Sequence, residues 1–108
     1  MATDVILVLP DYGSYPTWKP GTDEYNVDPE NLPISKDLAD QLNVWGDEYD
    51  ATLNQDDPIS SGFLEEASKS SFAERGAELA RRLAIELAGR YRVEYHDIRT
   101  GQREMIAG

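Results

Sequence analysis

The distribution of apolar positions predicts a strand near each end of the chain. Residues 4–9 read DVILVL, a continuous apolar run that is too short for a helix and that Pro10 stops. Residues 90–98 read RYRVEYHDI and alternate between apolar and polar positions, as in a strand with one buried face. Residues 100–101 (Thr-Gly) favour a turn, and residues 103–106 are expected to return as a short strand. The buried face of this predicted hairpin carries Tyr91, Val93 and Tyr95.

Apolar residues at helical spacing follow in the middle of the chain. Ser35 is a suitable N-cap residue, and the apolar stripe of an amphipathic helix follows it at Leu38, Leu42, Trp45, Tyr49 and Leu53. Gly46 interrupts this helix at a cost of roughly 1 kcal/mol relative to alanine. We therefore expect another element to approach the helix closely beside Trp45. Pro58 and Gly62 mark the break that follows.

A second helix is predicted from a capping box at residues 71–74 to about Ala88, where a glycine follows. Its large apolar residues form one stripe, composed of Phe72, Leu79, Leu83 and Leu87. A row of alanines beside that stripe permits close packing against a sheet or another helix: Ala73, Ala77, Ala80, Ala84 and Ala88. On the polar side, Glu78 and Arg82 are spaced as an ion pair. Ile85 lies on the same polar side and is either simply exposed or part of an interface.

Residues 11–33 show no sustained period and form a long irregular segment. They contain four prolines, two glycines, three tyrosines and one tryptophan. Disordered segments are poor in aromatic residues, so this composition favours an ordered loop. We expect Tyr12, Tyr15 and Trp18 to pin it to the rest of the protein.

The order of these elements is strand, long loop, helix, helix, strand, strand. It predicts a single domain over residues 1–108 of the α+β class (or a small two-layer α/β domain), with two helices packed on a sheet of about three strands. If the first strand pairs in parallel with residues 90–98, the two helices form the crossover between them.

Composition narrows the function classes. The 108 residues carry a formal net charge of −11, and no residue is a cysteine. Residues 1–70 account for −12 of this charge and residues 71–108 for +1, since every arginine lies in the second part. This charge argues against binding to nucleic acid or to an anionic membrane. The start of the chain lacks the basic and apolar regions of a signal peptide, which favours a cytoplasmic location.

Candidate chemistry is sparse. No phosphate-binding loop is present, and the acidic stretches at residues 47–50 and 54–57 lack the glycine and the final glutamate of a calcium loop. We expect no metal, no cofactor and no catalytic residue. His96, the only histidine, leaves one catalytic alternative: a small enzyme or ligand-binding protein with His96 as base and residues 11–33 as a lid.

Aromatic and acidic residues are interleaved in the first two-thirds of the chain. Tyrosine and tryptophan anchor many protein interfaces, and an acidic field accelerates encounter with a basic partner. The residues expected to contact such a partner are Trp18, Tyr25, Asp40, Asp47, Glu48 and Asp50. For Trp18 and Tyr25, packing in the core is the alternative to exposure.

Part of the chain resembles a pattern found in small uncharacterised acidic bacterial proteins. The pattern is LPIS, a helix with a tryptophan that ends near Tyr-Asp, then GAELARRLAIEL and a Val-x-Tyr strand, over residues 32–97. This resemblance implies the fold and no particular activity. By size and acidity, the chain is also similar to immunity proteins that neutralise basic bacterial toxins.

Two non-enzymatic functions are consistent with these features. The leading one is a small acidic protein-binding module, namely an immunity-type inhibitor of a basic protein. The alternative is a structural, self-associating domain without a dedicated acidic binding face, in which the alanine row or Ile85 seals a homodimer.

Overall fold

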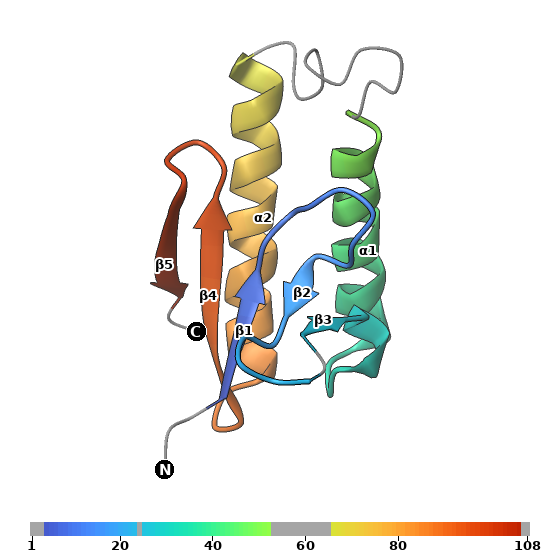
Figure 1. Ribbon diagram of the computed structural model, residues 1–108, viewed down its shortest axis with the longest axis vertical. Helices are drawn as coiled ribbons and strands as arrows, with labels where there is room; N and C mark the ends of the chain where they lie inside the picture. Colours follow the sequence, from blue (N-terminus) through green and yellow to red (C-terminus); the bar gives the residue numbers. More distant parts are fainter. Residues whose placement is uncertain (1–3, 24, 53–65, 107–108) are drawn as a thin grey trace.

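The computed structural model describes residues 4–23, 25–52 and 66–106, which form two helices, a short 3-10 helix and five strands (Figure 1). In chain order these elements are β1 (Asp4–Val8), β2 (Thr17–Trp18), β3 (Asn26–Val27), η1 (Pro29–Asn31), α1 (Lys36–Asp50), α2 (Glu66–Glu86), β4 (Tyr91–Asp97) and β5 (Gln102–Ile106).

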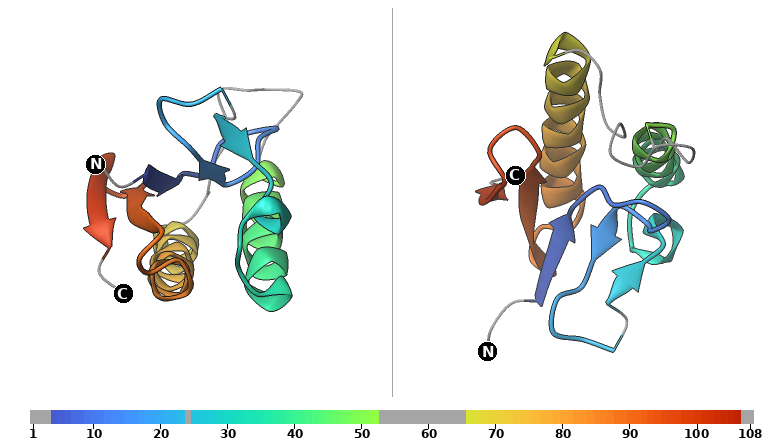
Figure 2. Two further views of the ribbon diagram at one scale, coloured as in Figure 1. Left: turned by 90° about the horizontal axis from the view of Figure 1, so that it is seen from below. Right: turned by 45° about the horizontal axis from the view of Figure 1, so that its top comes forward.

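The centre of the sheet is a parallel pair of strands. β1 pairs with β4, placing Ile6 beside Val93 and Val8 beside Tyr95. α1 and α2 lie between these strands in the chain, and both cover the same face of the sheet (Figure 2). The α+β class and the helical crossover are therefore confirmed. Antiparallel pairing extends the sheet on both sides, in the order β3-β2-β1-β4-β5.

The sheet has five strands, so the prediction of about three strands was wrong. The two additional strands, β2 and β3, arise within the irregular segment 11–33, and each has only two residues. Strands this short show no apolar alternation, because alternation needs at least four residues to be visible. The buried Thr17 hydroxyl donates to the Val27 carbonyl at 2.6 Å, which reinforces their pairing.

The first helix begins where its cap predicts. Ser35 Oγ accepts from the Leu38 N–H at 3.2 Å, and the predicted stripe is buried through Trp45. Leu53, the last predicted member, lies outside the described residues. The expected close approach also occurs: a Cβ atom at Gly46 would lie 3.3 Å from Pro16, so glycine lets the loop pack directly on α1.

The second helix begins earlier than predicted. α2 starts at Glu66, so residues 71–74 are interior and do not form a capping box. A Ser-x-x-Glu spacing is compatible with a helix interior, and helix-forming residues precede it. The predicted pair between Glu78 and Arg82 is also replaced, because Arg82 reaches across to Asp37 of α1 at 3.0 Å.

The alanine row of α2 packs inside the protein. Ala73 and Ala80 are fully buried, and Ala84 is nearly so. These three alanines are therefore unavailable for the predicted homodimer, whereas Ala77 is half-buried and Ala88, beyond the end of α2, is exposed. Ile85 is 62% exposed, so a homodimer through Ile85 stays a prediction.

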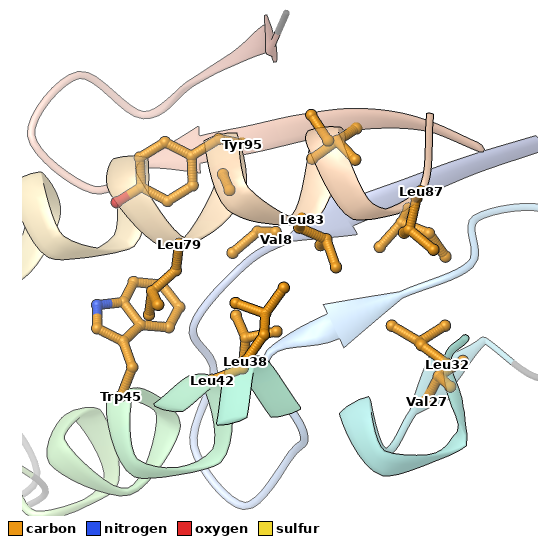
Figure 3. Close-up of a cluster of buried hydrophobic side chains, with 14 of the residues drawn as sticks. Val8, Val27, Leu32, Leu38, Leu42, Trp45, Leu79, Leu83, Leu87 and Tyr95 are labelled. Atoms are coloured by element: carbon orange, nitrogen blue, oxygen red, sulfur yellow. The ribbon is translucent and has the colours of Figure 1, made fainter. Parts of the chain in front are cut away.

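A cluster of aromatic side chains joins both helices to the sheet. The rings of Trp45 and Phe72 are stacked with centroids 4.5 Å apart, and the Trp45 indole donates to the Phe72 carbonyl at 3.0 Å. The Tyr95 hydroxyl of β4 donates to the Ala73 carbonyl at 2.8 Å. Burial raises the pKa of Tyr95, which keeps this donor protonated. Figure 3 shows Trp45 directed from α1 toward α2, in line with the leucines that continue the core.

Neither helix in the described part of the chain has the length and apolarity that crossing a bilayer requires.

Gly76 is expected to tolerate no side chain. A Cβ atom there would overlap the Trp45 ring and the Tyr95 hydroxyl. Gly76→Ala should lower the free energy of unfolding by about 2 kcal/mol, because the overlap outweighs the better helix propensity of alanine. Ser71→Ala, at an exposed position of the same helix, should not destabilise the protein. Urea denaturation of both variants tests this, and an unchanged Gly76→Ala stability would contradict it.

The turn between β4 and β5 is expected to weaken in acid. The buried Asp97 carboxylate accepts from the Arg99 backbone at 2.8 Å and from its guanidinium, and these hydrogen bonds lower the pKa of Asp97. A lowered native pKa contributes stability above the ordinary value of 3.8, and this contribution is lost as the pH falls through the native value. Asp97→Asn should therefore lower the free energy of unfolding at neutral pH. The difference in this free energy between the original protein and the variant should become smaller in acid. Denaturation of both proteins at several pH values measures this difference. A difference that does not change with pH would contradict the prediction.

Candidate partner-binding site

The side of α1 that faces away from the core is acidic. Asp40, Val44 and Asp47 recur at spacings of four and three residues and are exposed, opposite the buried Leu38, Leu42 and Trp45. We call Asp40, Val44 and Asp47 the outer face of α1. It is one continuous surface because these spacings place side chains on the same side of a helix.

The four acidic residues predicted on this helix have different environments. Asp40 lies 3.1 Å from Lys36, one turn earlier in the helix. Glu48 is directed toward α2, where Arg75 contacts both of its oxygens at 2.8 and 2.6 Å. Asp50 accepts from the Gly13 N–H at 3.0 Å. Within the described parts of the chain, Asp47 is the one residue of these four whose carboxylate makes no hydrogen bond or ion pair. The structure thus leaves Asp40 and Asp47 on the outer face and directs Glu48 and Asp50 to its two sides.

A groove of about 450 Å³ lies between α1 and residues 13–16. Pro16 rests on Gly46 at its base, and Asp47 and Asp50 line the helix side. Tyr15 lines the opposite side and is 45% exposed. We call this space the loop–helix groove. Its exposed polar lining comes from α1 and the loop together, so only the folded protein assembles it.

Residues on both sides of Tyr15 hold the loop wall of this groove. The Tyr12 ring stacks on Tyr49 of α1 at 4.6 Å, and its hydroxyl lies 2.9 Å from that of Thr52. Burial, together with this neighbouring phenol, raises the pKa of Tyr49 and keeps it neutral. The Asn26 side chain accepts from the Tyr15 N–H at 2.9 Å and donates to its carbonyl at 2.8 Å. Asn26 therefore fixes the Tyr15 backbone through two hydrogen bonds, and Tyr12 rather than Tyr15 stacks on α1.

Trp18 and Tyr25 lie away from the outer face of α1. Trp18 pairs in register with Leu7 and therefore shares its face of the sheet, whereas Ile6 and Val8 face the helices. Trp18 is 7% exposed and its indole donates to the Leu9 carbonyl at 2.9 Å, so it packs rather than contacts a partner. Tyr25 meets it edge-on at 5.0 Å and is 48% exposed. Tyr25 thus stays a predicted contact with a partner, and its ring packs against the buried Trp18.

A second groove, of about 380 Å³, runs between the two helices. Val44 and Leu79 supply apolar lining, and the basic lining residues Arg75 and Arg82 already pair with acids of α1. Its charges are therefore largely compensated within the protein.

The structure offers little support for a site at His96. His96 faces Arg103 across the β4–β5 pair, and no described carboxylate accepts a hydrogen bond from its imidazole. In residues 4–23, 25–52 and 66–106, no group of three or more acidic or histidine side chains is arranged to hold a metal.

A known protein family matches most of the chain. Residues 4–98 match the model of a family described as Serratia CdiI immunity protein-like. The chain belongs to this immunity protein-like family. The match spans β1 through β4, so it includes both helices, the loop–helix groove and the outer face of α1. The immunity-type resemblance expected from size and charge is confirmed, and the family corresponds to an inhibitor-type binding module. The comparison with curated proteins gives no match.

The sequence does not predict Tyr15, Asn26 and Asn43 as lining of the loop–helix groove. The loop composition predicts Tyr15 as a residue that pins the loop, and the two asparagines carry no signal because asparagine is common in loops and on helix surfaces. The glycine at position 46 was the one available signal, since it marked where the loop would approach α1.

The loop wall is expected to depend on Tyr12. Tyr12→Ala removes the stack on Tyr49 and should destabilise the protein by about 2 kcal/mol, and the Gly13 amide should exchange with solvent faster. Tyr12→Phe keeps the stack and loses only the contact with Thr52, so it should cost about 1 kcal/mol. Denaturation together with hydrogen exchange distinguishes the two. An unchanged Gly13 exchange rate in Tyr12→Ala would show that the stack does not hold the loop.

Proposed function

We propose that this protein is a non-enzymatic, immunity-type inhibitor that binds a basic protein toxin through the outer face of α1. The observation that carries this proposal is the exposure of Asp40 and Asp47 on one side of a helix whose inward-facing acids are already paired. Membership of the immunity protein-like family supports an inhibitor-type role. The basic character of the partner is inferred from charge alone.

The ion pairs of the protein explain why the outer face keeps its charge. Arg75 and Arg82 of α2 neutralise Glu48 and Asp37, the acids that α1 directs toward α2. Arg99 and Arg103 pair with acids of α2 and the sheet, on the other side of the molecule. In the part of the chain that the structure describes, Lys36 is the one basic residue paired with the outer face, through Asp40. Among the described residues, Asp40 and Asp47 are therefore acids of α1 that no arginine pairs.

Such a surface is suited to inhibition by binding alone. An acidic patch attracts a basic partner over several ångströms and raises the association rate. A toxin that acts on an anionic substrate needs a basic surface, and an acidic protein seated on that surface occludes it. No catalytic group of the inhibitor takes part.

Charge reversal on the outer face should weaken binding of the partner. The folded protein is used as bait in an extract of the source cell at about 50 mM and about 500 mM NaCl, and captured proteins are identified by mass spectrometry. We expect a basic toxin that is captured at low salt and released at high salt. The double variant Asp40→Lys/Asp47→Lys should weaken its binding by about tenfold or more, equivalent to about 1.4 kcal/mol.

The matched control is Asp4→Lys/Glu104→Lys. It changes the net charge by the same amount at exposed positions of β1 and β5, and β5 lies on the opposite side of the molecule from α1 (Figure 1). This control should bind the toxin nearly as well as the original protein. Capture of no basic protein, or equal loss of binding in both double variants, would overturn the proposal.

A further inference from the structure

We infer that the loop–helix groove receives an arginine side chain of the partner. This inference rests on the proposed function, because it assumes a basic protein partner, and it adds the place and the chemistry of one anchoring contact. The groove adjoins the outer face of α1, since Asp47 belongs to both.

The charge of the groove selects a cation. Asp47 and Asp50 line it, and no lysine or arginine is among its described lining residues. The Asp47 carboxylate makes no hydrogen bond or ion pair with any described group, and the Asp50 carboxylate uses one oxygen for the Gly13 N–H. A carboxylate has about four acceptor positions, so both acids retain capacity for an incoming donor. Asn43 donates to Asp28 at 3.5 Å, which leaves its carbonyl oxygen as a further acceptor at the same wall.

The opposite wall of the groove favours a planar cation. Tyr15 lines this wall and the residue is 45% exposed, although large aromatic residues are usually more covered in a folded protein. A guanidinium group stacks on such a ring and presents a fork of N–H donors to carboxylates. A lysine ammonium carries the same charge but cannot stack as a plane or donate in this parallel manner. Arginine therefore matches both walls, whereas lysine matches only the acidic one.

The groove is formed before any partner arrives. Tyr12 holds the loop to α1 from one side, Asn26 clamps the Tyr15 backbone from the other, and Pro16 rests against Gly46 at the base. A preformed pocket spends little conformational entropy on binding. The interhelical groove is a poorer site for a cation, because Arg75 and Arg82 are among its lining residues.

Small peptides test the groove without the toxin. The probes are acetyl-Gly-Arg-Gly-amide, its lysine counterpart and its citrulline counterpart, which is an uncharged isostere of arginine. Each is titrated into the folded, isotopically labelled protein while amide chemical shifts are followed by NMR. We expect saturable shifts for the arginine peptide that centre on Ser14, Tyr15, Asn43 and Asp47, about fivefold weaker binding of the lysine peptide, and no localised shifts with citrulline.

Three variants measure the separate contributions of the Tyr15 wall and the acidic wall to peptide binding. Tyr15→Leu keeps an apolar side chain without a ring face and should reduce the preference for arginine over lysine to nearly one. Asp47→Asn should weaken the arginine peptide about fivefold or more. Glu104→Gln makes the same change of charge on β5 and should leave the peptide affinity unchanged. Circular dichroism confirms that each variant is folded.

Two results would overturn the inference. The first is a set of shifts spread evenly over the acidic surface with no preference between arginine and lysine. The second is an unchanged arginine affinity in Asp47→Asn. These results are distinguishable from failure of the proposed function, since a toxin can bind elsewhere on α1 while the groove ignores arginine. Conversely, the groove can bind the peptide in a protein whose partner is not a toxin.

Discussion

The structure depends on the contact between the Trp45 ring of α1 and α2 at Gly76. The indole stacks on Phe72 and donates to its carbonyl, so one side chain both fills the space between the helices and fixes their rotation. Tyr95 reaches the neighbouring turn of α2 from β4, and only a glycine at position 76 leaves room for both rings. Helix packing, sheet and core are thereby joined at one place.

The functional surface follows from this packing. Once Trp45 is directed toward α2, helical geometry turns Asp40 and Asp47 outward and Glu48 toward Arg75. The arginines of α2 then neutralise the inner acids, so charge is left where a partner can reach it. On the other side of α1, Gly46 admits Pro16, and the loop forms the second wall of a groove whose first wall is acidic. The outer face and the groove are therefore two consequences of how one helix is oriented.

Much of the fold could be predicted from local patterns. The stripe of α1, its Ser35 cap, the alternation in β4 and the turn before β5 are each encoded within about a dozen neighbouring residues. The start of α2 was mispredicted because a Ser-x-x-Glu spacing is compatible with both the beginning and the interior of a helix. The strands β2 and β3 were missed because two residues carry no period. Of the predicted contact residues, Trp18 is buried. Its burial follows from its register with Leu7, and that register cannot be known before the pairing of the strands is known.

The sequence by itself determined the element types, the excess of acid in the first two-thirds of the chain and the resemblance to immunity proteins. These properties are local or compositional, so they do not depend on how the elements pack together. Only the tertiary structure decided which acids are paired and which are exposed, and which aromatic ring faces solvent. The reason is that ion pairs such as Arg82 with Asp37 join residues 45 positions apart. Such contacts depend on the relative orientation of two helices, which packing at Gly76 sets.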